Sequence, residues 1–319
     1  MLLRFIAAAL AAAFAAAAAA QSAYPSAPVK LVVGFPPGGA NDILARLIGA
    51  KLQEAWGQPV VTENKPGANA IIATEYVAKS APDGYTLLIG ASGAMTFNPG
   101  LYAKLPYDPV RDFAPVTMLG SFPLVLAVNP ALPAHSVREL VAHAKEAGGK
   151  LNYAAGSTPF QLAAELFKMQ AGVAINHIPY KGSAAAVNSV IANDTQMTFV
   201  DAPPVVGQVR GGKLRGLAVT SRTRAESLPE LPTMIEAGMP GFDVVLWASL
   251  FAPAATPRVV LERIHQDSVK ALQLADVRKR MLDLGITPVG NAPEELAAVV
   301  RADLDKWTRV AKQAGVKAE

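Results

Sequence analysis

The sequence predicts a two-lobed α/β fold in which each lobe is a doubly wound sheet with flanking helices. Short β-branched runs alternate with helical patterns over 29–92 and again over 123–221. The short connections favour parallel strands joined by crossover helices. The last part of the chain is one more strand and then helices, which suits a return to the first lobe. We expect 24–124 and 246–319 to form lobe 1 and 125–245 to form lobe 2.

The first lobe begins with VKLVVGF (29–35), a short β-branched run ended by Pro-Pro-Gly-Gly, as in a strand. Residues 42–57 place apolar side chains such as Leu44 and Ile48 at helical spacing, and Gly57 is the expected stop. The elements expected next are a strand at 59–64, a helix at 70–84, a strand at 85–92 and a loop at 90–99.

The second lobe repeats the alternation. Ser136 and Glu139 form a capping box at the start of its first helix, and Ser183 is the expected cap of a later one. Its expected strands are 123–130, 150–159, 175–180, 195–204 and 214–221, and its helices are 136–149, 160–172 and 183–194. Residues 201–204 read as a Pro-rich turn. The C-terminal part, which we expect to return to the first lobe, comprises a strand in 244–257 and helices at 258–275, 275–285 and 293–315.

The first 23 residues stand apart. Arg4 precedes an unbroken apolar run (5–20), and small residues follow before Tyr24, which is typical of a secretory signal peptide. The alternative is a membrane anchor, but the run of about 16 residues is shorter than the ~20 that span a bilayer. We expect cleavage near residues 20–23 and an exported, periplasmic protein.

Composition excludes several classes of protein. The chain of 319 residues has no cysteine, so it has no disulfide, thiolate metal site or cysteine nucleophile. Its net charge of +4 is spread along the chain without a nucleic-acid-binding run, although it favours anionic small molecules. We expect a monomer that needs no cofactor and binds neither a metal nor nucleic acid.

The loop GFPPGGAND (34–42) is the strongest candidate site. Gly38 and Gly39 let a ligand approach the backbone, and the free N–H groups at the following helix start suit a carboxylate or phosphate. Neither a Walker motif nor a dinucleotide motif is present, which argues against nucleotides. A tight turn remains the alternative. Asp42 is expected to cap the helix rather than to face the ligand.

Three other loops are expected to open on the same cleft, because ligands of open α/β sheets bind beyond the carboxyl ends of the strands. These are 90–99, 154–161 and 179–185. Their small polar residues can also be plain helix caps or turns.

Catalytic motifs are weak. Ala94 stands where a G-x-S-x-G elbow needs glycine, no paired-histidine spacing occurs, and the four histidines are expected to be structural. Asp201 ends a strand on the cleft side; it can pair with Lys181 or Arg215, or cap a turn. A hydrolase working through Asp201 is therefore the alternative to a binding protein.

With these motifs assembled, the sequence resembles the periplasmic receptors of tripartite tricarboxylate transporters, also called Bug-type receptors. The motifs that carry the resemblance are YPSAPVKLVVGFPPGGANDILARLIGAKL, VVTENKPGA, VAKSAPDGYTLLIG, NPGLYAKLPYDPVRDFAPVT, KLNYA, HIPYKGSAAAV, GKLRGLAVTS and APAATPR. The resemblance implies a type II periplasmic-binding-protein (Venus-flytrap) fold without catalysis. It also implies a small carboxylate held by both lobes, partly through bridging waters, and transient contact with a membrane permease. An orphan sensor that serves a signalling partner remains the alternative.

The loop positions and the resemblance together give the expected ligand-binding residues. They are Phe35, Pro37, Gly38, Gly39, Ala40, Asn41, Asp42, Ser92, Ala94, Gly156, Ser157, Thr158, Lys181, Gly182, Ser183 and Asp201. We expect one ligand carboxylate at 38–41, with lobe 2 closing on the other end.

The chain departs from the family at Asn69 and Ala70, which replace glycines, and in a shortened 154–161 loop. Phe160 in that loop favours an apolar or aromatic carboxylate, and the ligand's identity stays open.

Overall fold

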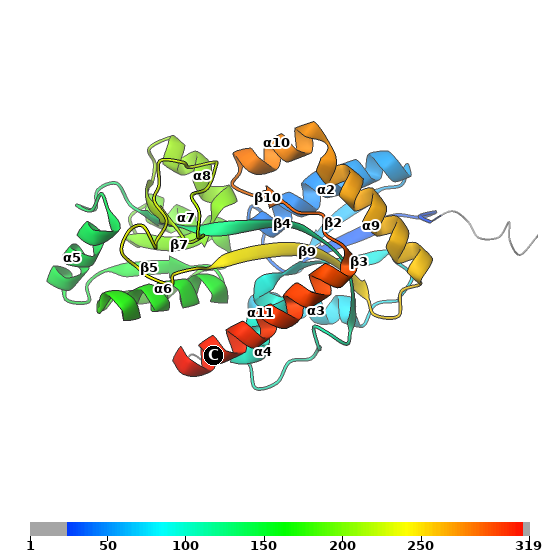
Figure 1. The fold of residues 1–319 in the computed structure, drawn as a ribbon, viewed down its shortest axis with the longest axis horizontal. Helices are drawn as coiled ribbons and strands as arrows, with labels where there is room; N and C mark the ends of the chain where they lie inside the picture. The colour runs from blue at the N-terminus through cyan, green and yellow to red at the C-terminus, as the bar shows by residue number, and fades with distance from the viewer. Residues whose placement is uncertain (1–23, 315–319) are drawn as a thin grey trace, which may run out of the picture.

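Two long antiparallel strands, β4 (Phe113–Val128) and β9 (Val245–Pro253), connect the two lobes of the molecule (Figure 1). The computed structural model describes residues 24–314. Within them the strand order is β2-β1-β3-β9-β4-β7-β5-β6, and β8 and β10 also pair with β4. Up to Pro123, β4 pairs with β9; from Leu124 onward it pairs with β7 and β8. One strand therefore belongs to both lobes.

Lobe 1 has a parallel core, as predicted. Its strands are β1 (Val29–Val33), β2 (Val60–Asn64) and β3 (Thr86–Ala91), and its first helices are α2 (Ala40–Trp56), the short η1 (Ala68–Ala70) and α3 (Ile71–Ala78). Helix α2 buries Leu44, Ile48 and Leu52, the apolar face that the sequence predicts. Gly57 ends it with a left-handed backbone (φ 63°), which confirms the predicted stop.

Lobe 2 repeats the alternation. Its strands are β5 (Asn152–Ala155), β6 (Asn176–Pro179), β7 (Met197–Asp201) and β8 (Arg215–Val219), and its helices are α5 (Val137–Ala147), α6 (Thr158–Ala171), α7 (Ser183–Ile191) and α8 (Ala202–Arg210). The Ser136 hydroxyl accepts from the Glu139 amide at 3.2 Å, so the predicted cap is confirmed. The Glu139 carboxylate reaches back to the amide of His135.

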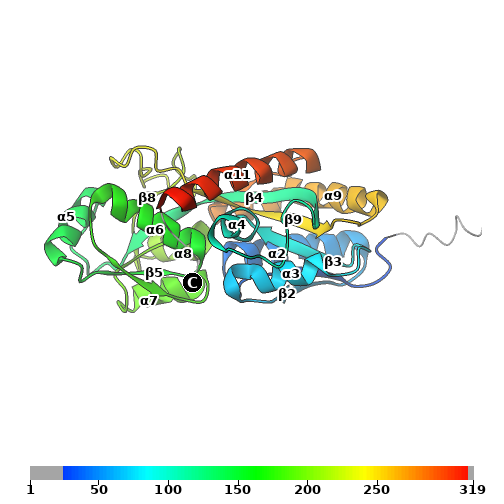
Figure 2. The same ribbon diagram turned by 90° about the horizontal axis from the view of Figure 1, so that it is seen from below.

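The C-terminal part lies against the elements of lobe 1 (Figures 1 and 2). It consists of α9 (Arg258–Gln273), α10 (Ala275–Asp283), β10 (Thr287–Pro288) and α11 (Pro293–Ala314). Helix α11 packs on η2 (Gly93–Phe97), a π-helical turn, and on α4 (Asn98–Leu101). The rings of Phe97 and Trp307 stack there with centroids 4.0 Å apart.

Three sequence interpretations are corrected. Strand β9 is antiparallel to both of its neighbours, β3 and β4, and β4 begins at Phe113 rather than 123. The Pro-rich turn after Asp201 is the first turn of α8, where a proline needs no amide hydrogen. The expected loop at 90–99 is largely helical, because α11 covers it and its buried backbone forms internal hydrogen bonds.

The predicted signal peptide lies outside the described residues. The lobe boundaries at 124/125 and 245/246 remain predictions.

Candidate functional site

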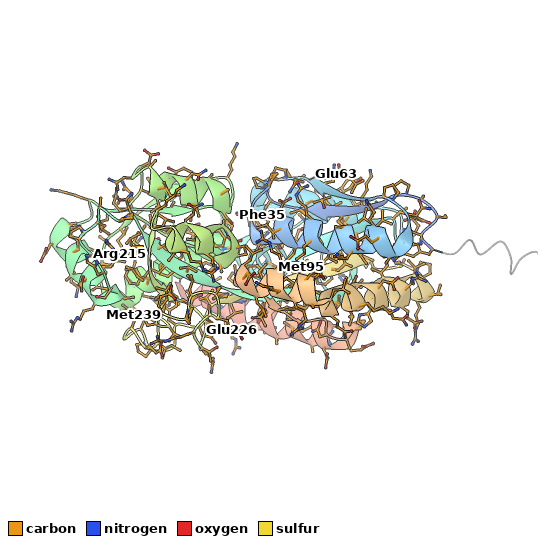
Figure 3. The ribbon with its side chains drawn as sticks, turned by 90° about the horizontal axis from the view of Figure 1, so that it is seen from above. Phe35, Glu63, Met95, Arg215, Glu226 and Met239 are labelled. Atoms are coloured by element: carbon orange, nitrogen blue, oxygen red, sulfur yellow. The ribbon has the colours of Figure 1, made fainter. Side chains whose placement is uncertain are left out.

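A pocket lies between the lobes, at the carboxyl ends of β1, β3, β5 and β7. It is lined by Phe35, Pro36, Gly39, Ala40, Asn41, Asp42, Ala91, Ser92, Gly93, Phe122, Gly156, Ser157, Pro159, Phe160, Ser183, Asp201, Leu246 and Trp247. Figure 3 shows Phe35 at the boundary between the two lobes. The enclosed free space of the pocket is about 30 Å³, which holds a water molecule or two, so an organic ligand requires the lobes to move apart.

The start of α2 supplies backbone donors to this pocket. The Gly38 amide donates to Asp42 Oδ2 at 3.0 Å, and the Ala40 amide donates to Asp201 Oδ2 at 2.7 Å. For the amides of Gly39 and Asn41, residues 24–314 provide no acceptor. The helix start thus already binds one carboxylate, from the opposite lobe, and keeps two donors for another group.

Asp42 has a structural role at this helix start. It is the third helical residue rather than the N-cap, so the predicted capping position is wrong; Gly39 is the N-cap. Its carboxylate reaches back to Gly38 and also accepts from Arg46 and from Asn64 Nδ2. Burial raises the pKa of Asp42, but these hydrogen bonds and the Arg46 charge outweigh burial and hold it below its ordinary value.

Asp201 is the most buried carboxylate at the pocket, with 3% of its surface exposed. Oδ2 accepts from the Ala40 amide, and the Ser183 hydroxyl also donates to the carboxylate. Oδ1 is buried and has no hydrogen-bond donor within the described chain. Burial raises the pKa of Asp201, against the opposing effect of hydrogen bonding with Ser183, with the Ala40 amide and with its own amide.

The cationic partners expected for Asp201 lie elsewhere. Arg215 donates to the carbonyls of Pro130, Leu132 and Ala134, and Figure 3 shows it deep in lobe 2. Lys181 is exposed and borders a neighbouring hollow. Asp201 stands at the N-cap of α8 without a side-chain cap bond. All three sequence alternatives for Asp201 are therefore wrong, since its partner is a backbone amide of the other lobe.

Aromatic and aliphatic side chains form much of the pocket wall. Phe160 lies there, and the sequence did not single out Phe122, Leu246 and Trp247. These three come from β4 and β9, whose apolar runs could only be read as buried strands. The Ser92 hydroxyl accepts from the Trp247 amide at 3.3 Å and so fixes β9 against the end of β3.

The structure places most of the predicted site residues together. Those that line the pocket are Phe35, Gly39, Ala40, Asn41, Asp42, Ser92, Gly156, Ser157, Ser183 and Asp201. The other six do not line it. Pro37 is exposed, and Gly38 faces Ala184. Ala94 is buried within η2 and Thr158 in the first turn of α6, whereas Lys181 and Gly182 border the neighbouring hollow. Ligand binding by these residues remains a prediction.

Direct contacts hold the two lobes closed around the pocket. The Thr158 amide donates to Asn69 Oδ1 at 3.3 Å, so Asn69, one of the departures from the family pattern, joins the lobes. Gly182, not Ser183, is the N-cap of α7, so the predicted Ser183 cap is wrong. Within lobe 2, a Cβ added to Gly156 would lie 2.2 Å from the Gly182 carbonyl oxygen, so the contact between these two loops requires glycine.

Residues 24–314 contain no group of three or more acidic or histidine side chains arranged to hold a metal ion. None of the helices there combines the length and apolar character that a bilayer crossing requires. The four histidines also lie outside the pocket lining.

Comparison with known proteins identifies the family. Residues 44–316 match the model of the tripartite tricarboxylate transporter family receptor, TctC. The chain belongs to this family. Protein BugT of Bordetella pertussis is 37% identical over 297 residues, which cover 92% of this chain and 91% of BugT. The resemblance inferred from the motifs is therefore confirmed.

Solved structures of relatives have the same fold. Rpa4515 of R. palustris, solved with adipate, superposes with a TM-score of 0.89 at 35% identity and covers 92% of this chain and 99% of its own. MatC of Rhodopseudomonas palustris, solved with bound malate, gives 0.85 at 32% identity over 90% and 99%. The receptor thus has the two-lobed fold of periplasmic binding proteins. Its relatives are solute-binding receptors, which are not enzymes.

Proposed function

We propose that this receptor binds a small carboxylated metabolite outside the cytoplasm and delivers it to a tripartite tricarboxylate-type membrane transporter. Two relatives of the same fold were solved with the carboxylates adipate and malate. Family membership and the signal-like pattern of residues 1–23 support the location and the transporter.

The observation that carries the proposal is the start of α2. It holds the Asp201 carboxylate on the Ala40 amide and leaves the Gly39 and Asn41 amides for a ligand carboxylate beside it. A charge-assisted hydrogen bond contributes about 1.5–3 kcal/mol. A few such bonds reach micromolar affinity, about 8 kcal/mol. Because residues of both lobes line the pocket, a ligand there stabilises the closed form.

A thermal-shift panel of mono-, di- and tricarboxylates tests binding. A ligand at about 100 times its dissociation constant stabilises the folded receptor by about 2.7 kcal/mol, which gives a clear rise in melting temperature. Failure of every carboxylate to raise it, confirmed by calorimetric titration, contradicts the proposal. Delivery is tested by uptake of the labelled ligand into vesicles that contain the cognate permease, with and without the receptor.

A further inference from the structure

Two side-chain oxygens of the pocket lack hydrogen-bond donors. They are Asp201 Oδ1 and Asn41 Oδ1, and both are buried. Both residues line the same pocket, and Asp201 binds the amide of Ala40, the residue before Asn41. Buried acceptors in native proteins nearly always have a partner, and an unmet one is costly. Both oxygens therefore call for a group that donates hydrogen bonds.

Asp201 also lacks a cation. No lysine, arginine or histidine is among the described residues that line the pocket. The Arg46 guanidinium is nearby in sequence but is bound to Asp42 and Asn64. A buried carboxylate without a positive partner is strongly disfavoured, so the missing charge is best supplied by the occupant of the pocket.

Donors and acceptors are both present at this helix start. The amides of Gly39 and Asn41 suit a carboxylate, and the oxygens of Asn41 and Asp201 suit an ammonium group. An α-amino acid carries both groups on a single carbon atom. We propose that the ligand is an α-amino acid whose carboxylate binds the amides of Gly39 and Asn41 and whose ammonium binds Asn41 Oδ1 and Asp201 Oδ1. This inference rests on the proposed function and narrows its ligand class.

The remaining walls select the side chain of this amino acid. Phe122, Phe160 and Trp247 bring aromatic surface to the pocket, and Leu246 adds aliphatic surface. A second carboxylate on the ligand would lose water against these walls and would be repelled by Asp201. The pocket therefore takes branched aliphatic or aromatic amino acids in preference to acidic ones.

Calorimetric titration at about pH 7 with two matched series tests the proposal. One series is L-leucine, its 2-hydroxy analogue and 4-methylpentanoate; the other is L-phenylalanine, L-phenyllactate and 3-phenylpropanoate. In at least one series we expect the amino acid to bind at least about 30-fold more tightly than the acid without a donor, with the hydroxy acid between them. Asp201→Asn should reduce that ratio to less than about threefold.

Two further variants keep the test decisive. Asn41→Ala removes one acceptor and should also lower the ratio, which covers the case of a poorly folded Asp201→Asn. Asp243→Asn is the matched control, because Asp243 pairs with Arg222 on the surface of lobe 2 and should leave the ratio unchanged.

The outcomes separate this inference from the proposed function. Equal or tighter binding of the acids without a donor, binding of dicarboxylates alone, or an unchanged ratio in both Asp201→Asn and Asn41→Ala overturns the amino-acid assignment. In those cases the carboxylate-receptor function stands. If no carboxylate of any kind binds, the proposed function fails, and the inference fails with it.

Discussion

The start of α2 in lobe 1 and the end of β7 in lobe 2 each bring one buried carboxylate to the interlobe pocket, with opposite surroundings. Asp42 has a guanidinium, a side-chain amide and a backbone amide, and its pKa is lowered. Asp201 has a backbone amide and a hydroxyl but no cation, and its pKa is raised.

This difference suits Asp42 to a structural role and Asp201 to ligand binding at the same site. Asp42 is fully partnered by residues of its own lobe, so its carboxylate fixes the geometry of the helix start. Asp201 is partnered across the lobes and keeps one oxygen without a donor, so its charge can be matched only when the pocket is occupied.

Gly39→Val should remove binding almost completely. A Cβ at residue 39 would lie 3.2 Å from Ser183 Oγ and 3.6 Å from Asp201 Oδ2, so a branched side chain there prevents the two carboxylate-bearing regions from meeting. We expect the affinity to fall by about 100-fold or more, about 2.7 kcal/mol, by calorimetric titration. Gly207→Val is the control, because a Cβ there meets nothing within 4 Å. Full affinity in a folded Gly39→Val receptor would show that the loop is not the site.

Replacing each carboxylate should change stability in opposite directions. Asp42→Ala leaves the Gly38 amide and Asn64 without their acceptor, and we expect a loss of about 2 kcal/mol in the free energy of unfolding. Asp201→Asn removes a buried charge that has no cation, so the ligand-free protein should be as stable as the wild type or more stable. Urea denaturation of both variants measures this. Similar losses in the two would mean that the surroundings of the two carboxylates are energetically equivalent.

The ligand-free receptor should close more readily in acid. Opening exposes Asp201 to water, where its pKa returns toward the ordinary 3.8, whereas closing raises it. The closed form therefore holds the proton more tightly. This contribution to closing is present at low pH and is lost as pH rises through the raised pKa.

Small-angle scattering between about pH 7 and about pH 4.5 can follow this change. The radius of gyration should decrease toward acid in the wild type and stay constant in Asp201→Asn. Asp42 has a lowered pKa and stays ionised over this range, so it does not contribute. An equal acid response in Asp201→Asn would assign the effect to another group.

Lys181→Ala should have the smallest effect. Lys181 is exposed and borders the neighbouring hollow, so solvent and salt screen the interaction of its charge with a bound anion. We expect less than about a twofold change in affinity at physiological salt, measured as for Gly39→Val. A loss of tenfold or more would place the lysine at the ligand after all.

Local patterns predicted most of the fold, because they report local energetics. The β-branched runs became β1 to β3, Gly57 ended α2, and Ser136 with Glu139 capped α5. The failures concern where polar side chains point. A serine or aspartate near a helix start predicts a cap, but Ser183 and Asp42 bind elsewhere, since tertiary partners outcompete the local ones.

The site could be predicted only in part for the same reason. The sequence identified the loops that carry Gly39, Ser157 and Asp201, because they follow strands. The hydrogen bond between Asp201 and Ala40 joins residues 161 positions apart, so no local spacing in the sequence predicts it. Phe122 and Trp247 lie within apolar strands, so nothing local distinguishes a residue that faces a ligand from one that faces the core.

The passage of β4 through both lobes restricts how the receptor can move. The chain crosses between the lobes within β4 and at the start of β9, and those strands are hydrogen-bonded side by side. Opening must therefore bend the two paired strands across their width. Twisting or sliding of one lobe past the other would break the hydrogen bonds between β4 and β9. The outer faces should consequently travel along one reproducible arc. The angle between these faces then reports whether the pocket is occupied.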